Sequence, residues 1–588
     1  MHPRNATFHQ SKTNTHNLKV DFKNAFNCVS RTAFLEAVAT HLPGAHNYIK
    51  LAYKEASTLL CQDETIDSAE GAQQGDPLGP LLFCLAIQTL ITTIKSPLNV
   101  WYLDDGTLGG SAEEVLSDFN FLKQESMKIG LEINIGKSEI FCSTQSRFPQ
   151  APDNLKVLQD NDVLLLGGAL TPASVETLLE QKLNLLKHFQ TRLRILPHHQ
   201  ALFLLKSSFG PVRLIHALRS SPCWKSNILQ QMDDVVKETL EEILNVQFSQ
   251  SKWLQATLPV GKGGLGVRRL TQLSIPAFIA STVGTAHLVE ACLPPLPNQP
   301  TVGEDLKVAI DSWQQISQSA VLPESRHQND WDRPVYEAEF VAISSSLSDT
   351  ELARLSAATA KHSGDWLRTM PISKCGLALS NNELRISVCL RLGLPIFGSH
   401  MCTCGDLIDP LGQHCFVCKR NSGKHARHHA INQLIQRELS RCDIPSESEP
   451  SGLFGMNQLR PDGITTVPWS RGQQLIWDLT CTHSLSASNL RSTSGEIGKA
   501  AAMAEENKNR KYSPIPGHLI FTPIALEILG IYGPLATRFF SEVGKRQATV
   551  LGDQTAKHKL YQRVLIELQR GNARCIMFAL KLKNDQDD

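Results

Sequence analysis

Residues 100–108, Val-Trp-Tyr-Leu-Asp-Asp-Gly-Thr-Leu, constrain the fold of this chain more than any other stretch. The apolar residues on both sides of the acids predict two short strands, and Asp-Gly is the strongest short-range signal for a hairpin. Two adjacent carboxylates at a hairpin tip repel each other unless cations neutralise them, and such hard oxygen ligands suit Mg²⁺ or Mn²⁺. On this stretch alone, a solvated Asp-Asp-Gly turn is the alternative.

A further acid, Asp21, ends a predicted strand and precedes a turn and a helix. A strand end is rigid enough to hold a metal ligand. Between the two acid sites, residues 71–80 (GAQQGDPLGP) predict a loop that enters an apolar helix, with prolines where a first helical turn tolerates them. Such a loop can offer backbone N–H groups to a ligand that carries phosphate.

Three more segments complete this pattern. Residues 112–128 predict a helix packed on the sheet. Residues 130–141 (GLEINIGKSEIF) predict a strand, a turn and a second strand, with one lysine. Residues 164–170 (LLLGGAL) predict an apolar strand with a glycine kink. The predicted unit is thus a sheet with helices and with acids along one edge.

The segments DFKNAFN, QQGDPLGP, YLDD, LEINIGKSEIF and LLLGG resemble, in this order, the palm motifs of reverse transcriptases of non-LTR (LINE-type) retrotransposons. The resemblance implies an RNA-directed DNA polymerase with a palm of antiparallel sheet and helices. Two divalent ions about 3.5–4 Å apart would activate a 3′-hydroxyl and stabilise the pyrophosphate that leaves. By resemblance Asp21 and Asp104 bind these ions, and Asp105 supports them.

The resemblance also implies nucleotide-binding roles. Phe26 would crowd the sugar 2′ position, and Gln74 and Gly75 would stack against the incoming nucleotide and the template. Lys137 would protonate the pyrophosphate, although a solvated turn lysine fits the sequence equally well. Only 20 residues precede Asp21, so we expect the fingers subdomain to be missing. This expectation leaves two alternatives open, a catalytically inactive nucleic-acid-binding fragment or relic, and a chain that is only a nuclease.

The length of 588 residues predicts several domains. The net charge of +1 means that any nucleic-acid footprint must be local. The 15 cysteines stand mostly alone in apolar segments, which fits a reducing compartment. No secretory signal opens the chain, and the longest apolar run is too short to cross a bilayer. We therefore expect a soluble intracellular protein of the nucleus or cytoplasm, without membrane contact.

Apolar spacing and proline density divide the chain further. Helical spacing begins near residue 175, and the proline-rich residues 293–300 mark a linker. The Gly-rich residues 258–270 (LPVGKGGLGVRRL) allow a phosphate loop, although no Lys-Ser/Thr follows the glycines. The predicted domains are a palm over 1–172, a helical thumb over 173–290, a connector over 291–396, a zinc knuckle over 397–425 and a nuclease over 426–588.

Two close pairs of soft ligands, separated by a short loop, predict a tetrahedral zinc site formed by Cys402, Cys404, His414 and Cys418. Cys415 is a possible substitute ligand. Only one residue separates the first pair, so unliganded loop cysteines are the alternative. The basic residues 419–429 follow directly, and they indicate either a nucleic-acid contact surface or a solvated basic loop.

Two more acids, Asp462 and Asp478, each abut apolar residues, as acids at matching heights on neighbouring strands would. A helix at 504–512 then bears Lys508 and Lys511. Two acids and a lysine suit metal-assisted hydrolysis of a phosphodiester, because the acids hold the ion and the lysine orients or activates water. Ordinary acids at strand ends are the alternative.

The segments RPD, WDLT and KNRKY resemble the restriction-enzyme-like nuclease that follows a Cys-His knuckle in one class of non-LTR elements. By resemblance Asp462 and Asp478 bind Mg²⁺ or Mn²⁺, Lys508 or Lys511 is catalytic, and Glu438 is a possible third ligand. The whole chain would be a multidomain α+β protein with an α/β endonuclease domain. It would nick target DNA and extend the freed 3′-hydroxyl on an RNA template, with dNTPs as substrates and with Mg²⁺ and Zn²⁺ as cofactors.

Overall fold

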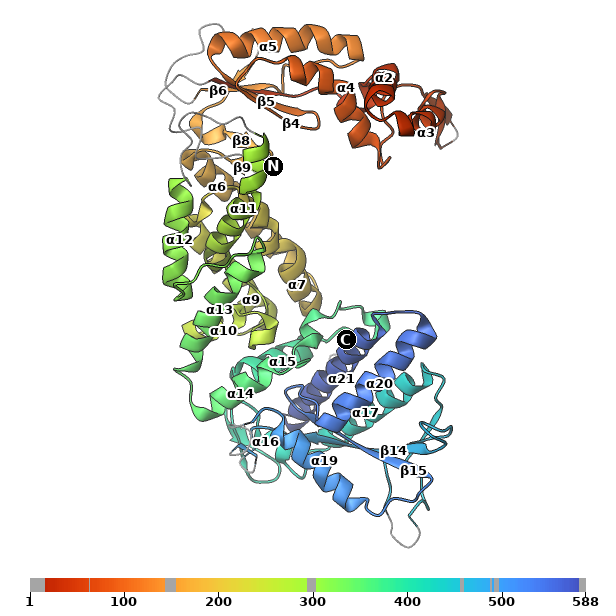
Figure 1. Cartoon of the computed structure of the whole chain (residues 1–588). Coiled ribbons are helices and arrows are strands. Elements are labelled where there is room, and N and C mark those ends of the chain that lie inside the picture. Colours follow the sequence, from red (N-terminus) through yellow and green to blue (C-terminus); the bar gives the residue numbers. More distant parts are fainter. Residues whose placement is uncertain are drawn as a thin grey trace.

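The computed structural model describes residues 16–62, 64–142, 155–292, 303–454, 459–486, 489–490 and 496–580. Three parts follow one another along the chain in Figure 1: a sheet with helices, a column of helices, and a C-terminal unit of sheet and helices. The two sheets lie at opposite ends of the column. The expected mixed α+β, multidomain architecture is confirmed. The proline-rich residues 293–300 lie outside the described residues.

The N-terminal sheet has five strands in the order β4-β5-β1-β6-β7. The central strand β1 pairs antiparallel with β5 and with β6, and only the short β7 joins in parallel. The strands are β1 (His16–Val20), β4 (Leu98–Tyr102), β5 (Asp105–Gly110), β6 (Glu139–Cys142) and β7 (Lys156–Val157).

Helices pack on this sheet and extend beyond it. The predicted helix at 112–128 is present as α5 (Ala112–Glu125), which continues as a 3₁₀ turn. A capping box between Ser111 and Glu114 begins it. The other elements are α1 (Ala25–Cys28), α2 (Arg31–His41), α3 (Pro43–Tyr53), α4 (Gly79–Thr93) and the hairpin of β2 (Ser57–Cys61) and β3 (Glu64–Ser68).

The acid hairpin is present, but its turn differs from the prediction. Leu103 and Asp104 form the turn, whereas Asp105 and Gly106 already belong to β5. Leu103 adopts a left-handed φ of 58°, which a hairpin turn requires and which glycine or asparagine would adopt more easily. This strand position requires glycine, because a Cβ atom at Gly106 would stand 2.6 Å from the Trp101 ring.

Two other predictions of strands are wrong in detail. In residues 130–141 only β6 is a strand, and Ile133 makes an isolated bridge to Phe22. In residues 164–170 the glycine kink is a tight turn between β8 (Leu164–Leu165) and β9 (Gly168–Ala169). Leu166 and Gly167 both have positive φ, as a two-residue hairpin turn demands.

The column consists of helices whose apolar faces meet in a large core and in a separate cluster around Trp313 and Trp331. Within the described residues, one helical segment, His198–Ser220, is long and apolar enough to cross a membrane by length and composition alone. Of its most apolar window, 44% is buried inside the protein. Its buried residues, among them Leu202, Leu205 and Leu218, belong to the large core. The helices are α6 (Pro172–Leu193), α7 (His198–Leu204), α8 (Ile215–Ser220), α9 (Ile228–Leu244), α10 (Gln250–Thr257), α11 (Leu270–Cys292), α12 (Glu304–Ser317), α13 (Gln328–Ser344), α14 (Asp349–Thr359) and α15 (Asn381–Leu392).

The Gly-rich segment 258–270 links α10 to α11 and closes on itself. The backbone N–H groups of residues 262–266 donate to carbonyl oxygens of residues 256–260. The carbonyl oxygens of Val260 and Gly264 accept from the buried guanidinium of Arg391 at 2.7 and 3.1 Å. These N–H groups are thus used within the loop, and its carbonyls face a cation, so the phosphate-loop interpretation is wrong.

The C-terminal unit contains a four-stranded sheet in the order β12-β13-β14-β15. The strands β14 and β15 are parallel, and the crossover helix α19 joins them. The elements are β10 (His400–Met401), β11 (Leu407–Ile408), α16 (His414–Val417), α17 (Gly423–Ser440), β12 (Ser446–Ser448), β13 (Gly463–Thr465), β14 (Gln474–Thr482), α19 (Lys499–Lys511), β15 (Leu519–Glu527), α20 (Pro534–Leu551) and α21 (Ala556–Ala579).

Side chains alternate between the two faces of β14. Leu475, Trp477 and Leu479 join the large core shared with the column, whereas Ile476 joins a small cluster with Tyr512 at the end of α19. Asp478 lies on the same face of β14 as Ile476. The large core runs from Ala169 to Met577, and the N-terminal sheet has a separate core between Leu18 and Leu155.

Candidate active sites and metal cluster

The three N-terminal acids converge at one edge of the sheet. Asp21 follows the last residue of β1, and Val20 pairs with Gly106, so the register brings Asp21 beside Asp105. Asp104 occupies the hairpin turn next to it. The backbone N–H of Asp21 donates to the Ser138 hydroxyl at 3.2 Å, which fixes the strand end.

The electrostatics of this edge show that the acids interact. Burial raises the pKa of Asp105, and the charges of Asp104 and Asp21 raise it further, against the opposing effect of Lys19. The Oδ1 atom of Asp21 is buried without a hydrogen-bond partner. A buried, unpartnered carboxylate oxygen beside two other carboxylates is a donor set that fits a hard divalent cation such as Mg²⁺ or Mn²⁺.

The predicted nucleotide-binding residues are tied to this edge. Phe26, in α1, stacks on Phe83 of α4 with 4.7 Å between ring centroids. The carbonyl oxygen of Phe26 accepts from the Ala72 N–H at 2.8 Å, which anchors the loop that carries Gln74 and Gly75. Both loop residues are exposed, and Gly75 has a φ of 93°. The loop therefore presents an open backbone beside Phe26.

Lys137 stands in the turn before β6. Its neighbour Ser138 contacts Asp21, and the carbonyl oxygen of Asp21 accepts from the Asn134 N–H at 2.7 Å. The turn is thus bonded to the acid-bearing strand at two points. The Lys137 side chain is exposed, so its reach toward the acids and its solvation are both compatible with the structure.

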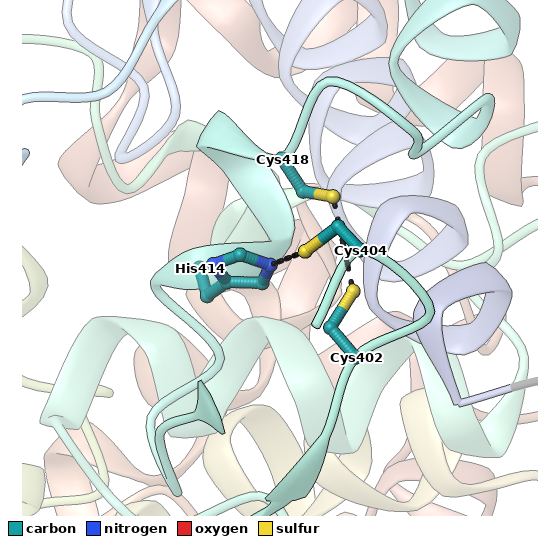
Figure 2. Close-up of side chains that lie close together, drawn as sticks. All are labelled: Cys402, Cys404, His414 and Cys418. Carbon is teal, nitrogen blue, oxygen red and sulfur yellow. Dashed lines mark hydrogen bonds between the residues drawn. The ribbon is translucent and has the colours of Figure 1, made fainter. Parts of the chain in front are cut away.

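The four predicted zinc ligands come together (Figure 2). The ligand atoms of Cys402, Cys404, His414 and Cys418 all lie within 4.8 Å of one another. The Sγ atoms of Cys402 and Cys418 are 3.8 Å apart, and the Cys404 Sγ is 3.2 Å from Nε2 of His414. Three sulfurs and one imidazole at this spacing suit tetrahedral Zn²⁺.

The surroundings prepare these groups to bind a metal. The backbone N–H of Cys404 lowers the pKa of the Cys402 thiol to about 6, which favours the thiolate that a metal requires. Burial and the hydrogen bond with Cys402 raise the pKa of the Cys404 thiol to about 11, so Cys402 is the thiol of this pair that ionises first. Cys415 is fully buried, and burial raises the pKa of its thiol to about 12. It is not a member of the cluster, so the structure leaves no need for it as a substitute ligand.

The basic residues 419–429 divide into two groups. Arg427 is buried, donates to Oδ1 of Asn572 at 2.8 Å and lies over the Phe416 ring, so it holds α17 against α21. Lys419, Arg420, His425 and His429 are exposed beside the cluster. The exposed group lies at the start of α17 and just before it, where helical N–H groups also favour an anion.

In the C-terminal sheet, the two predicted acids face each other across adjacent strands. Gly463 pairs with Trp477, so Asp462 and Asp478 stand at the same height. The backbone N–H of Asp462 donates to the Trp477 carbonyl at 2.9 Å, and the N–H of Leu479 donates to Oδ2 of Asp462 at 2.5 Å. The strands therefore place Asp462 opposite Asp478 in the register and hold the Asp462 carboxylate on the Leu479 N–H.

The helix α19 supplies two further groups. Nζ of Lys508 donates to Oδ1 of Asp478 at 2.6 Å, and the Tyr512 hydroxyl donates to Oδ2 at 2.6 Å. Burial, followed by Asp478, raises the pKa of Tyr512, so its hydroxyl stays protonated. The ammonium of Lys511 lies over the Tyr512 ring instead, 5.4 Å from its centroid. The structure thus favours Lys508 of the two predicted lysines.

The helix α17 reaches the same acids. Nε2 of His428 lies 3.1 Å from Oδ2 of Asp462 and 3.1 Å from the Leu479 carbonyl oxygen. Glu438, one of the predicted ligands, is turned away from this site. It accepts from Arg563 and Gln547 and is 2% exposed, so its role as a third ligand is wrong.

Sequence reasoning missed two residues of this site, Tyr512 and His428. Tyr512 follows Lys508 by four residues and therefore lies on the same helical face, a signal that was available. His428 stands within the basic stretch, so the sequence suggested a basic surface residue and did not indicate its contact with Asp462. The two aspartates supply carboxylate oxygens of the kind that a hard cation takes, and Lys508 and Tyr512 both donate hydrogen bonds to the Asp478 carboxylate.

Comparisons with known proteins agree with the N-terminal site. Residues 1–188 match the family described as Reverse transcriptase (RNA-dependent DNA polymerase). The chain is 24% identical over 590 residues to the Retrotransposable element SLACS 132 kDa protein of Trypanosoma brucei gambiense, an alignment that covers 94% of this chain and 44% of that protein. This chain therefore spans less than half the length of that relative.

Among solved structures, telomerase from Candida albicans in complex with a TWJ fragment of telomeric RNA aligns with a TM-score of 0.26 and 13% identity, over 61% of this chain and 50% of that one. The family match carries the assignment. Residues 1–188 are a reverse transcriptase domain, in a chain that is related to a retrotransposable element protein.

Proposed function

We propose that this chain is the RNA-directed DNA polymerase of a non-LTR retrotransposon and that it also nicks DNA, so that the freed 3′-hydroxyl primes synthesis on an RNA template. The observation that carries the polymerase is the placement of Asp21, Asp104 and Asp105 at one sheet edge, where the charges of Asp104 and Asp21 help to raise the pKa of Asp105. DNA, RNA and dNTPs are the substrates that follow from this proposal.

In this mechanism the three carboxylates hold Mg²⁺ or Mn²⁺, which supplies electrostatic stabilisation of the nucleophile and the leaving pyrophosphate. Phe26 borders the sugar, and the exposed loop with Gln74 and Gly75 lies along the base pair that is being formed. Lys137 donates a proton to the pyrophosphate. These residues thus position the sugar and the base pair or protonate the pyrophosphate.

The test of the polymerase is primer extension on an RNA template in Mg²⁺. We compare the wild type with D104N/D105N and with D67N, an exposed acid of β3 that serves as the matched control. Loss of the acids should lower the rate by roughly 10³-fold, which corresponds to about 4 kcal/mol of lost electrostatic stabilisation. No extension by folded wild-type protein would refute the proposal.

A second activity is favoured by the C-terminal geometry. Asp462 and Asp478 face each other, and Lys508 contacts Asp478, which is an arrangement suited to metal-assisted hydrolysis of a phosphodiester. The acids would hold the cation, and the Lys508 ammonium would orient water or carry a proton at Nζ. Nicking of supercoiled plasmid DNA that Asp462→Ala abolishes would support the endonuclease, and nicking that persists in this variant would reject it.

The cluster of Cys402, Cys404, His414 and Cys418 binds Zn²⁺ in this proposal, and the exposed basic residues beside it contact nucleic acid. Because the cluster immediately precedes α17, it fixes the start of the helix whose His428 contacts Asp462. The zinc site would thus shape the surface that receives DNA, without a role in the chemical step.

A further inference from the structure

We infer that Tyr53 is a positioning residue for the incoming nucleotide, because its hydroxyl holds both ends of the turn that carries the exposed pair Gln74 and Gly75. This inference rests on the proposed polymerase, in which the exposed pair lies along the base pair that is being formed. Tyr53 is the last residue of α3, a helix that carries none of the predicted polymerase residues.

The first argument is the pair of hydrogen bonds that the hydroxyl makes. It donates to Oδ2 of Asp76 and accepts from the backbone N–H of Gln73 at 3.3 Å. Oδ1 of Asp76 accepts from the Leu78 N–H at 2.8 Å, so the same carboxylate also ties the turn to the start of α4. Gln73 and Asp76 directly flank the exposed pair. One hydroxyl group therefore fixes the residues on both sides of it.

The second argument is that the ring of Tyr53 is itself fixed. The residue is 2% exposed, and Phe34 of α2 meets its ring edge-on, with 5.2 Å between the centroids. The guanidinium of Arg31 lies over the same ring, 5.4 Å from its centroid, and donates to the Gly71 carbonyl oxygen at 3.1 Å. A side chain that is locked by packing can hold a functional residue in place. The hydroxyl is therefore a rigid anchor for a turn whose residues 73–75 are exposed.

The third argument is the strength of the contact. Burial and then Asp76 raise the pKa of Tyr53 to about 12, so the hydroxyl keeps the proton that it donates at neutral pH. A hydrogen bond to a carboxylate is roughly twice as strong as one between neutral groups. The substitution Tyr53→Phe removes this hydrogen bond and keeps the ring. It therefore releases the turn while the buried packing remains.

The test compares the wild type with Tyr53→Phe, Asp76→Asn and the double variant in primer extension on an RNA template. Tyr48→Phe is the matched control, because Tyr48 lies on the same helix and is 69% exposed. The KM for dNTP and kcat are determined for each protein. Hydrogen exchange of residues 71–79, with α5 as the reference segment, is measured in parallel and does not require activity.

In Tyr53→Phe we expect the KM for dNTP to rise about 10-fold while kcat changes by less than about 2-fold, because the acids at the sheet edge are not altered. Exchange in residues 71–79 should be about 10-fold faster, with α5 unchanged, since the Gln73 N–H loses its acceptor. Tyr48→Phe should match the wild type. In the Asp76→Asn background, Tyr53→Phe should raise the KM by less than about 3-fold, because the hydroxyl acts chiefly through that carboxylate.

Extension by the wild type with the same KM and kcat in Tyr53→Phe would overturn the inference and leave the polymerase standing. A fall in kcat with an unchanged KM would also overturn it, because Tyr53 would then act on the chemical step or on folding. Faster exchange with an unchanged KM would reduce the contact to a structural role and reject the inference. No extension by folded wild-type protein would remove the proposed polymerase, and the inference with it.

Discussion

The Nζ atom of Lys508 lies 2.6 Å from Oδ1 of Asp478, although 30 residues separate them. The contact neutralises the more buried of the two C-terminal acids, which is 5% exposed. A cation on a helix thus lies directly on the buried carboxylate and remains close to the site at which water would act. This contact also distinguishes Lys508 from Lys511, the other predicted lysine.

We predict that Lys508→Ala lowers the rate of DNA nicking by roughly 10²-fold or more, the range of a lost acid–base group. Lys511→Ala should leave the rate about unchanged, because its ammonium lies over the Tyr512 ring and not on a carboxylate. Plasmid-nicking rates in Mn²⁺ measure both variants. Equal losses would contradict the assignment.

Zinc content should depend on four residues and not on a fifth. We predict about one Zn²⁺ per chain, lost in Cys418→Ala and retained in Cys415→Ala, because Cys415 lies outside the cluster. Metal analysis after gel filtration measures the stoichiometry. Zinc lost from the Cys415 variant alone would show that the ligand set is wrong.

The buried histidine His199 should make the helical column sensitive to acid. Burial lowers its pKa to about 4, and the Leu379 N–H donates to its Nδ1 at 3.1 Å. Since an unfolded histidine has a pKa of about 6.5, the folded chain binds fewer protons between these values. Its stabilising contribution is complete above about pH 6.5 and is lost as the pH falls toward 4.

At pH 5 this loss amounts to about 2 kcal/mol. His199→Asn keeps a neutral acceptor for Leu379, so the difference in melting temperature between pH 7 and pH 5 should be smaller in this variant than in the wild type. Thermal unfolding at both pH values provides the measurement. An identical pH dependence of the two proteins would show that His199 is not the group that titrates.

The Gly-rich loop should tolerate alanine at one glycine and not at another. A Cβ atom at Gly264 would stand 2.0 Å from the Leu258 carbonyl oxygen, whereas nothing lies within 4 Å of one at Gly261. We predict a loss of about 3 kcal/mol for Gly264→Ala and less than about 0.5 kcal/mol for Gly261→Ala. Equilibrium unfolding in urea compares them. A tolerated Gly264→Ala would mean that the loop is not closed around Arg391.

The sequence predicted most where chemistry and periodicity coincide. Acids at strand ends identified the carboxylates that the structure places at two sheet edges, and the spacing of sulfur and imidazole identified the Cys–His cluster. The hairpin turn at Leu103 was missed because its left-handed residue is a leucine, which local propensity disfavours. The turn at Leu166 escaped prediction for the same reason.

Contacts that depend on tertiary packing were beyond the sequence. Glu438 was a candidate metal ligand because it is an acid in the helix that also carries His428. Arg563, 125 residues later, instead holds its carboxylate in the core. His428 lay within a basic stretch, and only the packing of α17 on β14 shows that it faces Asp462. Residue type identified candidates, and the packing of helices on the sheet decided which candidates meet.

The distribution of cores has a mechanical consequence. The column and the C-terminal unit share one apolar core, whereas the reverse transcriptase sheet has its own. A rotation at the junction between the two cores costs less buried contact than a bend within the column. We therefore expect the sheet with Asp21 to change its orientation more easily than the site with Asp462, which shares its core with the column.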